Sequence, residues 1–354
     1  MFFFLACLFA IIEHRNFNLK ENTRKLKYFG LIFVLFNVIS LATHAELIFE
    51  TSDGIINIFI LLLFYMLCKK ERDNTLKIFL ICLTVLFAFS LVEYVLYLLG
   101  RSYLLASYIE RGEGSSQVYA HGIFNVFFQN ALLVRFQGLF REPGHLGLLA
   151  GVLMFSLDKY NNKLWMAWLI YGLASLSLVF YLLLGIQFFL RIIEFKSYKR
   201  LWGVFCVVIT LLVAYNSSTF VQGIAEDAIF IRVEGYYDKG GDSRSTEDLD
   251  ERLDRANSFE TLFGYGVKSF NDKDLAWGNT GMKADAYKYG YVGIILLFLM
   301  AFVLIRYPRM IKYNILATFL LMLCYYYGDV KFSFHFHLPL YSLYYAYCIQ
   351  KKIQ

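Results

Sequence analysis

The sequence predicts an all-α, polytopic integral membrane protein, and its composition is the first reason. Of the 354 residues, 58% are hydrophobic and only 18% are charged, whereas a soluble domain averages roughly 45–50% apolar and about 25% charged residues. The second reason is that long apolar runs recur along the whole chain. No linker, low-complexity tract or internal repeat divides them, so we expect a single membrane domain over residues 1–354.

Eleven apolar segments are candidate membrane spans, with a range of ten to twelve. They are residues 1–12, 28–43, 54–68, 78–100, 144–157, 164–177, 178–192, 201–215, 286–305, 313–327 and 332–348. The first segment is short for a span of about 20 residues, which leaves open a short or tilted helix or a truncated start. The stretch 164–192 is too long for one span, so we divide it near Ser175–Ser177.

The charges of the loops predict the orientation. Lysine and arginine concentrate in every second loop, whereas the alternating short loops "HAELIFETSD" and "GDVK" carry almost none. The positive-inside rule places the basic loops and the C-terminus in the cytoplasm. The net charge of +6 therefore reflects membrane topology and does not indicate a nucleic-acid partner.

Two segments on the predicted outer side are long. Residues 101–142 form an outer loop whose apolar part "IFNVFFQNALLV" is a candidate re-entrant or interfacial helix. Residues 216–285 form a large outer loop in which acidic residues outnumber basic ones. Loops of this length without evident structure are uncommon and usually functional.

The sequence "RFQGLFREPGHLG" at 135–147 predicts a helix that begins at Pro143. Proline suits the first helical position because its missing N–H would have no partner there. Glu142 then stands at the N-cap. Because the helix enters the membrane from outside, its positive dipole end points to the outer headgroups, between Arg135 and Arg141.

Further along this helix, Gly147 and Gly151 have the GxxxG spacing. Glycines at this spacing provide a surface for close packing against another helix.

Two interpretations of the charged helix start remain open. A helix N-terminus with nearby arginines can bind phosphate, so Arg135 and Arg141 are candidate ligands of a lipid-linked pyrophosphate, and Glu142 or His145 could act on an acceptor hydroxyl. Alternatively, the arginines extend to the headgroups, Glu142 only caps the helix and His145 only packs.

The large loop contains a predicted amphipathic helix over 244–260. Leu249 and Leu253 are four residues apart, as are Glu251 and Arg255. Such spacing gives an apolar stripe and an i,i+4 ion pair. Arg255 can therefore bind a substrate or simply pair with its acidic neighbour.

Three ordered motifs resemble those of the O-antigen and capsule repeat-unit polymerases (Wzy-type), which are related to the O-antigen ligases. "R-x-x-G-x-F-x-E-P" opens a central helix. In the large outer loop, an arginine precedes "L-x-G-x-G-x-x-x-F", and "Y-x-x-G-x-x-G" follows where the chain returns to the membrane. The matching residues of these last two are Arg255, Leu262, Gly264, Gly266, Phe270, Gly290 and Gly293. The resemblance covers roughly residues 130–305.

The resemblance implies a GT-C-like glycosyltransferase of the bacterial cytoplasmic membrane. Such an enzyme joins undecaprenyl-pyrophosphate-linked oligosaccharide repeat units at the outer face, in company with a flippase and a chain-length regulator. It also implies that Arg135 and Arg141, and less securely Arg255, bind the pyrophosphate, with Gly264 and Gly266 in the substrate-binding loop. We expect no cofactor and no metal.

The identity of the base stays open between Glu142, His145 and Asp285. The related ligases carry a histidine in the large outer loop, but residues 216–285 contain none, which weakens a ligase-like alternative. A flippase or transporter of the same lipid-linked sugars is the alternative from another class. Transporters often show internal repeats and polar residues at the middle of the membrane, and neither is evident here.

Overall fold

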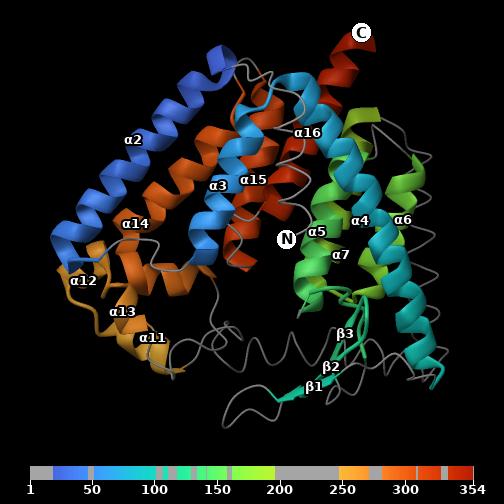
Figure 1. Ribbon diagram of the computed structural model, residues 1–354, viewed down its shortest axis with the longest axis horizontal. Coiled ribbons are helices and arrows are strands. Elements are labelled where there is room, and N and C mark those ends of the chain that lie inside the picture. Colours follow the sequence, from blue (N-terminus) through green and yellow to red (C-terminus); the bar gives the residue numbers. More distant parts are fainter. Residues whose placement is uncertain are drawn as a thin grey trace. The chain divides into compact units, whose positions relative to one another are not determined.

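The computed structural model describes residues 19–46, 52–100, 107–110, 118–128, 134–140, 142–157, 162–195, 247–270, 281–307, 310–327 and 334–353. The predicted spans 1–12 and 201–215 lie outside the described residues, as does Arg141. The chain divides into two compact units, one of Met1–Leu80 with Arg244–Gln354 and one of Ile81–Ser243. Both units are mainly helical (Figure 1).

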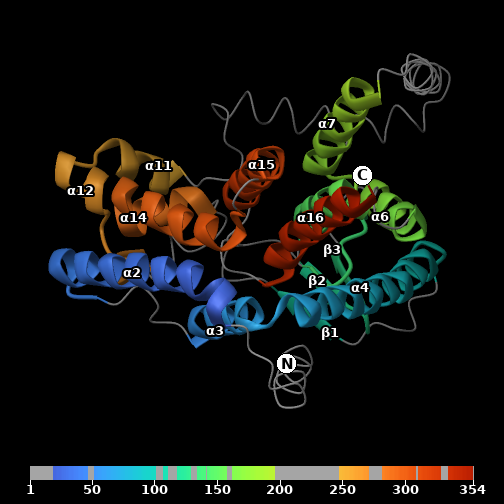
Figure 2. The same ribbon diagram turned by 90° about the horizontal axis from the view of Figure 1, so that it is seen from above.

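The first unit is organised around α14 (Gly281–Ile305). This helix packs against α2 (Leu19–His44), α15 (Ile311–Tyr327), α16 (Phe334–Ile353) and two short helices of the large loop, α12 (Ser258–Phe263) and α13 (Val267–Phe270). Figure 2 shows α2 running alongside α14, with α11 (Glu247–Asp254) and α12 beside them. The remaining helix, α3 (Ser52–Met66), contacts α2 and α16.

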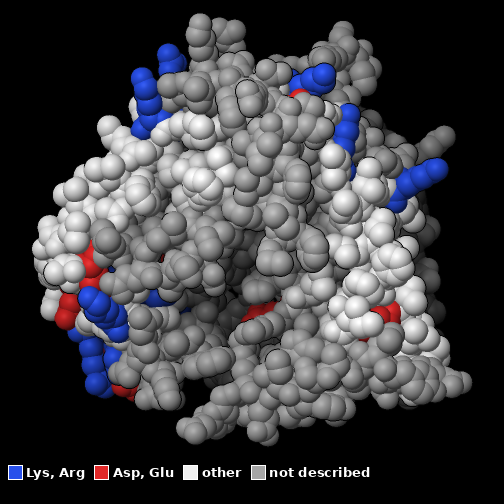
Figure 3. Space-filling model, viewed as in Figure 1, with Lys and Arg blue, Asp and Glu red and all other residues white. Residues whose placement is uncertain are grey.

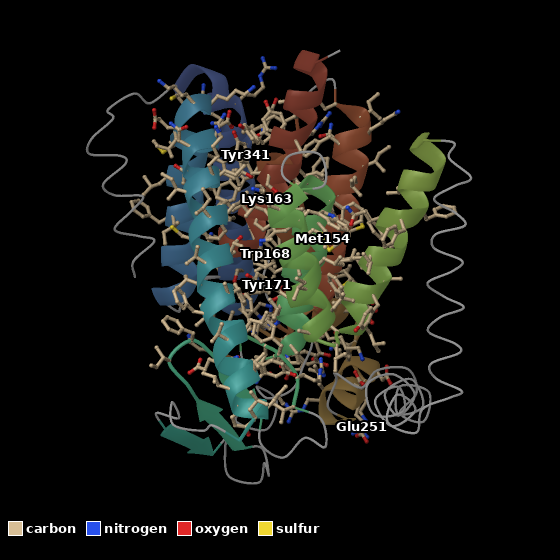
Figure 4. All side chains as sticks on the ribbon, turned by 90° about the vertical axis from the view of Figure 1, so that its right-hand side faces the viewer. Met154, Lys163, Trp168, Tyr171, Glu251 and Tyr341 are labelled. Atoms are coloured by element: carbon tan, nitrogen blue, oxygen red, sulfur yellow. The ribbon has the colours of Figure 1, made fainter. Side chains whose placement is uncertain are left out.

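A buried arginine ties the end of α3 and the start of α4 (Lys69–Leu98) to α16. Arg72, near the start of α4, is 1% exposed. One terminal nitrogen donates to the carbonyl oxygens of Tyr65 and Leu67 at 3.2 and 2.7 Å, and Nε donates to the Tyr341 hydroxyl at 3.4 Å. A buried charge is tolerated only with such partners. Figure 4 places Tyr341 and Glu251 at opposite ends of the unit, so this polar cluster lies far from α11.

The exposed charges over the start of α2 differ from those over α11 and α12 (Figure 3). Figure 3 shows lysine and arginine over the N-terminal part of α2, where Arg24 and Lys27 are exposed. Over α11 and α12, acidic and basic residues mix. The two ends of the first unit therefore carry different charge patterns.

The centre of the second unit is α5 (Pro143–Leu157), which begins at the predicted proline. Every residue from Leu146 to Leu157 is buried, because α6 (Asn162–Ala174) and α7 (Leu178–Phe195) pack on it. The division predicted within 164–192 is confirmed, since α6 and α7 are separated by Ser175–Ser177. Leu176 in this turn has a φ of 48°.

Close packing at Gly147 and Gly151 is confirmed. A Cβ atom at Gly147 would overlap the Ser177 side chain, and one at Gly151 would overlap Leu183. Both glycines of α5 therefore bring its backbone against the start of α7.

The other face of α6 is held by hydrogen bonds to α4. Trp168 Nε1 donates to the Thr84 hydroxyl, and the Tyr171 hydroxyl donates to the Thr84 carbonyl, both at 3.0 Å. Figure 4 shows Trp168 and Tyr171 following each other along α6. The polar atoms of both rings are thus satisfied within the unit.

A small antiparallel sheet occupies part of the segment 101–142. Its strands are β1 (Ser107–Glu110), β2 (Val118–His121) and β3 (Val126–Phe128), paired in that order. The re-entrant helix considered for "IFNVFFQNALLV" is therefore wrong over its described part, residues 123–128. A short apolar run with β-branched and aromatic residues suits a strand as well as a helix.

A buried carboxylate fixes the turn between β2 and β3. Glu93 of α4 is 4% exposed, and its two oxygens accept from the backbone N–H groups of Ile123 and Phe124 at 2.7 and 2.9 Å. The Asn125 amide donates to the Ser90 carbonyl at 3.0 Å. These bonds hold the turn against α4 and use donors that a helix would need.

Several helices have the character of membrane spans. Among the described residues, Arg24–His44, Lys69–Leu98 and Met282–Ile305 are long and apolar enough to cross a bilayer, and Pro143–Leu157, Leu178–Leu190 and Ile311–Tyr326 are shorter apolar helices. Ile78, Ile81, Val85, Phe89 and Val92 of α4 recur at helical spacing and are each 48–61% exposed. An exposed apolar stripe of this kind suits contact with lipid. The fold is that of a helical membrane protein with one small sheet.

Replacing Gly147 with alanine should lower the thermal unfolding midpoint of the detergent-solubilised protein. The added Cβ overlaps Ser177, and overpacking of this kind costs about 1–3 kcal/mol. Gly185→Ala in α7 is the matched control, because a Cβ there meets no atom within 4 Å. Equal midpoints for the two variants would contradict the close packing of α5 on α7.

Candidate functional site

The glycine turn of the large loop lies directly on a kink in α14. Tyr265 N–H donates to the Tyr287 carbonyl at 2.7 Å, and Gly266 N–H donates to the Lys288 carbonyl at 3.0 Å. The kink is at Gly290, whose φ is 63° and ψ is −174°. The motif "LFGYGVKSF" is thus joined by main-chain hydrogen bonds to α14 just before Gly290.

Glycine is required on both sides of this contact. A Cβ at Gly264 would lie 2.6 Å from the Tyr289 nitrogen, and a Cβ at Gly290 would overlap the Leu262 carbonyl. Gly264 and Gly290 also have positive φ values, 81° and 63°, which residues with a Cβ rarely adopt. Two independent constraints, space and backbone conformation, therefore select glycine here.

Aromatic packing secures the turn to α11 and α14. The rings of Tyr265 and Tyr287 are stacked with centroids 4.5 Å apart, and Tyr287 belongs to a buried cluster with Leu249, Phe270 and Ala284. Burial raises the pKa of the Tyr265 hydroxyl above its ordinary value, and this hydroxyl donates to the Arg252 carbonyl at 3.1 Å. The turn is consequently anchored through both its backbone and its side chains.

The amphipathic helix predicted over 244–260 is two helices. α11 ends at Asp254, and Asn257 caps α12: its side-chain oxygen accepts from the N–H groups of Phe259 and Glu260 at 2.9 and 3.0 Å. The Glu260 carboxylate accepts from the Asn257 N–H at 2.8 Å, which completes a capping box. The helical pattern was visible in the sequence, but this cap divides it.

Arg255 forms the ion pair that its spacing suggested. Its guanidinium lies 2.9 Å from the Glu251 carboxylate, with side chains 79% and 55% exposed. Exposed pairs of this kind add little stability. That Arg255 also binds substrate stays a prediction.

Asp285 lies in the first turns of α14 and is 1% exposed. Its carboxylate accepts a hydrogen bond from the Tyr325 hydroxyl of α15 at 2.8 Å. This bond links α14 to α15, and the Asp285 carboxylate is buried rather than exposed to a bound sugar.

Two residues that the sequence analysis passed over contact the glycine turn from the end of α2. The His44 Nε2–H donates to the Phe263 carbonyl at 3.0 Å. One Glu46 oxygen accepts from the N–H groups of Val267 and Lys268 at 2.6 and 3.2 Å. The available signal was "HAE", a histidine and a carboxylate in a predicted outer loop that otherwise has few charges.

The remaining predicted site residues lie in the second unit, around the start of α5. Arg135 Nε donates to the Ser175 carbonyl at 3.2 Å, next to the turn between α6 and α7. Glu142 is exposed and stands at the N-cap position, with its carbonyl accepting from the His145 N–H at 3.1 Å. His145 is partly buried, with its ring edge-on to Phe140 at a centroid distance of 6.2 Å. The predicted helix start and its flanking charge are both present.

The predicted site residues therefore fall into two groups. Arg255, Gly264, Gly266 and Asp285 belong to the first unit, and Arg135, Glu142 and His145 to the second. Among the residues that the structure describes, no group of three histidine, cysteine or carboxylate side chains could hold a metal ion.

Replacing Gly290 with alanine should destabilise the protein more than Gly30→Ala in α2. The left-handed conformation costs a residue with a Cβ about 1–2 kcal/mol, and overlap with Leu262 adds to this. A Cβ at Gly30 meets no atom within 4 Å. Thermal unfolding in detergent and the rate of trypsin cleavage after Lys268 measure the effect. A Gly290→Ala protein as stable and as resistant as Gly30→Ala would contradict the docking.

Comparison with known proteins gives no relative: no family model, no curated protein and no solved structure matches the chain.

Proposed function

We propose that this protein is a membrane glycosyltransferase that polymerises undecaprenyl-pyrophosphate-linked repeat units into a surface polysaccharide. The reaction would take place at the outer face of a bacterial cytoplasmic membrane, in a GT-C-like fold of about eleven spans. The first unit supports the proposed orientation, because exposed basic residues gather over the start of α2 and mixed charges cover α11 and α12 at its other end.

The contact between the glycine turn and the kinked helix is the observation that carries the proposal. Two of the three motifs in the polymerase resemblance meet there through Gly264 and Gly290. Each of these glycines lies against the backbone of the other motif's segment, which supports one shared, preorganised loop site.

The donor would be bound through the start of α5. A helix N-terminus presents free N–H groups and a positive dipole end to an anion. Arg135, fixed next to the α6–α7 turn, and Arg141 would add positive charge for the pyrophosphate leaving group. Stabilisation of developing charge by fixed donors is usually the largest single contribution to catalysis.

Single replacement of Arg135 and of Arg141 with alanine tests the donor site. In a host strain that lacks its own copy, each variant at normal protein level should shift surface polysaccharide from long chains to single repeat units. The loss of one such donor costs about 10²–10³-fold in rate. Arg306→Ala, at an exposed arginine beyond the end of α14, is the control and should leave long chains.

The outcomes also separate the alternatives. Normal chain length in both variants would contradict the pyrophosphate-binding proposal. Repeat units trapped on the inner leaflet would identify a flippase instead. Full-length polymer that stays on its lipid carrier would identify a ligase-like transferase.

A further inference from the structure

His44, the last residue of α2, is hydrogen-bonded to the residue that precedes the glycine turn, and this bond fixes which ring nitrogen carries a proton. A carbonyl oxygen only accepts, so the His44 Nε2 that bonds Phe263 must carry the proton. No hydrogen bond from the described residues is made to the other ring nitrogen, Nδ1. His44 is only partly buried. The second nitrogen is therefore left with a lone pair that can take a proton.

The backbone after α2 adopts a left-handed conformation at Ala45, between His44 and Glu46. Ala45, the first residue after the helix, has a φ of 55°, a left-handed conformation that costs a residue with a Cβ about 1–2 kcal/mol. The conformation is held by the Ala45 N–H donating to the Leu41 carbonyl at 3.1 Å and by the Ser40 hydroxyl donating to the Glu46 carbonyl at 2.9 Å. A left-handed residue with such a bond is a common way to end a helix, and here it fixes the backbone that carries His44 and Glu46.

Gly266 leaves room beside it for both the imidazole of His44 and the carboxylate of Glu46. A Cβ at Gly266 would lie 3.3 Å from Cγ of His44 and 3.2 and 3.4 Å from the two Glu46 carboxylate oxygens. Glu46 is 8% exposed, and one of its oxygens already binds the N–H groups of Val267 and Lys268. The turn thus fixes a negative charge beside the ring that would become positive.

We propose that His44 is the general base that deprotonates the acceptor sugar hydroxyl, with Glu46 as the positioning residue that holds the turn and opposes the charge on the ring. The proposal rests on the polymerase function. The hydroxyl proton passes to Nδ1 while the oxygen bonds to the anomeric carbon of the donor. The bond from that carbon to the pyrophosphate breaks, and its electron pair leaves with undecaprenyl pyrophosphate. The imidazolium then releases its proton to water.

His44 satisfies the requirements for a base better than Asp285. A base must reach the proton that it takes, and Asp285 is 1% exposed and bonded to Tyr325. His44 is partly exposed, keeps one nitrogen for proton transfer and is fixed by the other. A loop histidine is thereby supplied in space by α2, although the loop sequence has none.

Replacing His44 with glutamine distinguishes a role in accepting the proton from a role in the hydrogen bond to Phe263. Glutamine can still donate a side-chain N–H to the Phe263 carbonyl, but it has no basic nitrogen. The full-length protein is reconstituted in liposomes with lipid-linked repeat unit extracted from host cells that lack this chain, and polymer formation is timed. His44→Gln should lower kcat by about 10²–10⁴-fold with little change in KM. Leu41→Ala, at an exposed residue on the same helix, is the control and should match the wild type.

A His44→Gln protein with wild-type kcat would overturn the proposal and leave His44 as a tether. Should that variant fail to fold, Glu46→Gln tests the same arrangement, because its amide oxygen can still accept from both N–H groups while the charge is lost. It should lower kcat, and an unchanged kcat would overturn the proposal. A wild-type protein that joins no repeat units would refute the polymerase function itself, and the role of His44 with it.

Discussion

The first unit depends on one contact, the docking of the turn at Gly264–Gly266 on the kink at Gly290. Two main-chain hydrogen bonds join the turn to α14, and neither backbone could approach the other with a Cβ in the way. The kink itself frees the carbonyl groups that accept these bonds, since a regular helix would use them internally. The large loop is thereby fixed to α14, and α11, α12 and α13 take their positions from this contact.

Buried glutamates hold loops in both units by the same chemistry. Glu46 accepts two backbone N–H groups after the glycine turn, and Glu93 accepts two in the turn between β2 and β3. A carboxylate at the edge of an apolar region is costly unless it is hydrogen-bonded, and unpaired loop N–H groups are costly for the same reason. Each pairing removes both costs at once. Glu46 lies two residues beyond the end of α2 and Glu93 lies in the C-terminal part of α4, so each glutamate ties a loop to one of these helices.

The helices could be predicted from the sequence because apolar length and loop charge are local properties. The division at Ser175–Ser177 followed from length alone, and the start of α5 followed from Pro143. The predicted re-entrant helix failed because a short apolar run near "VFF" does not distinguish a strand from a helix, and only contacts with α4 decide between them.

The hydrogen bond between His44 and Phe263 could not be predicted for a similar reason: it joins residues 219 positions apart, and no spacing pattern records such a contact. The meeting of the glycine motifs could be suspected from the resemblance, but their shared need for backbone space required the structure.

We expect this one protein to join lipid-linked oligosaccharides without another enzyme. The most direct measurement incubates the purified wild-type chain in liposomes with undecaprenyl-pyrophosphate-linked repeat unit and separates the products by size. We expect a ladder of chains that grow by whole repeat units, with release of undecaprenyl pyrophosphate. Repeat units that cross the bilayer but remain single, or that stay unchanged at the outer face, would contradict it.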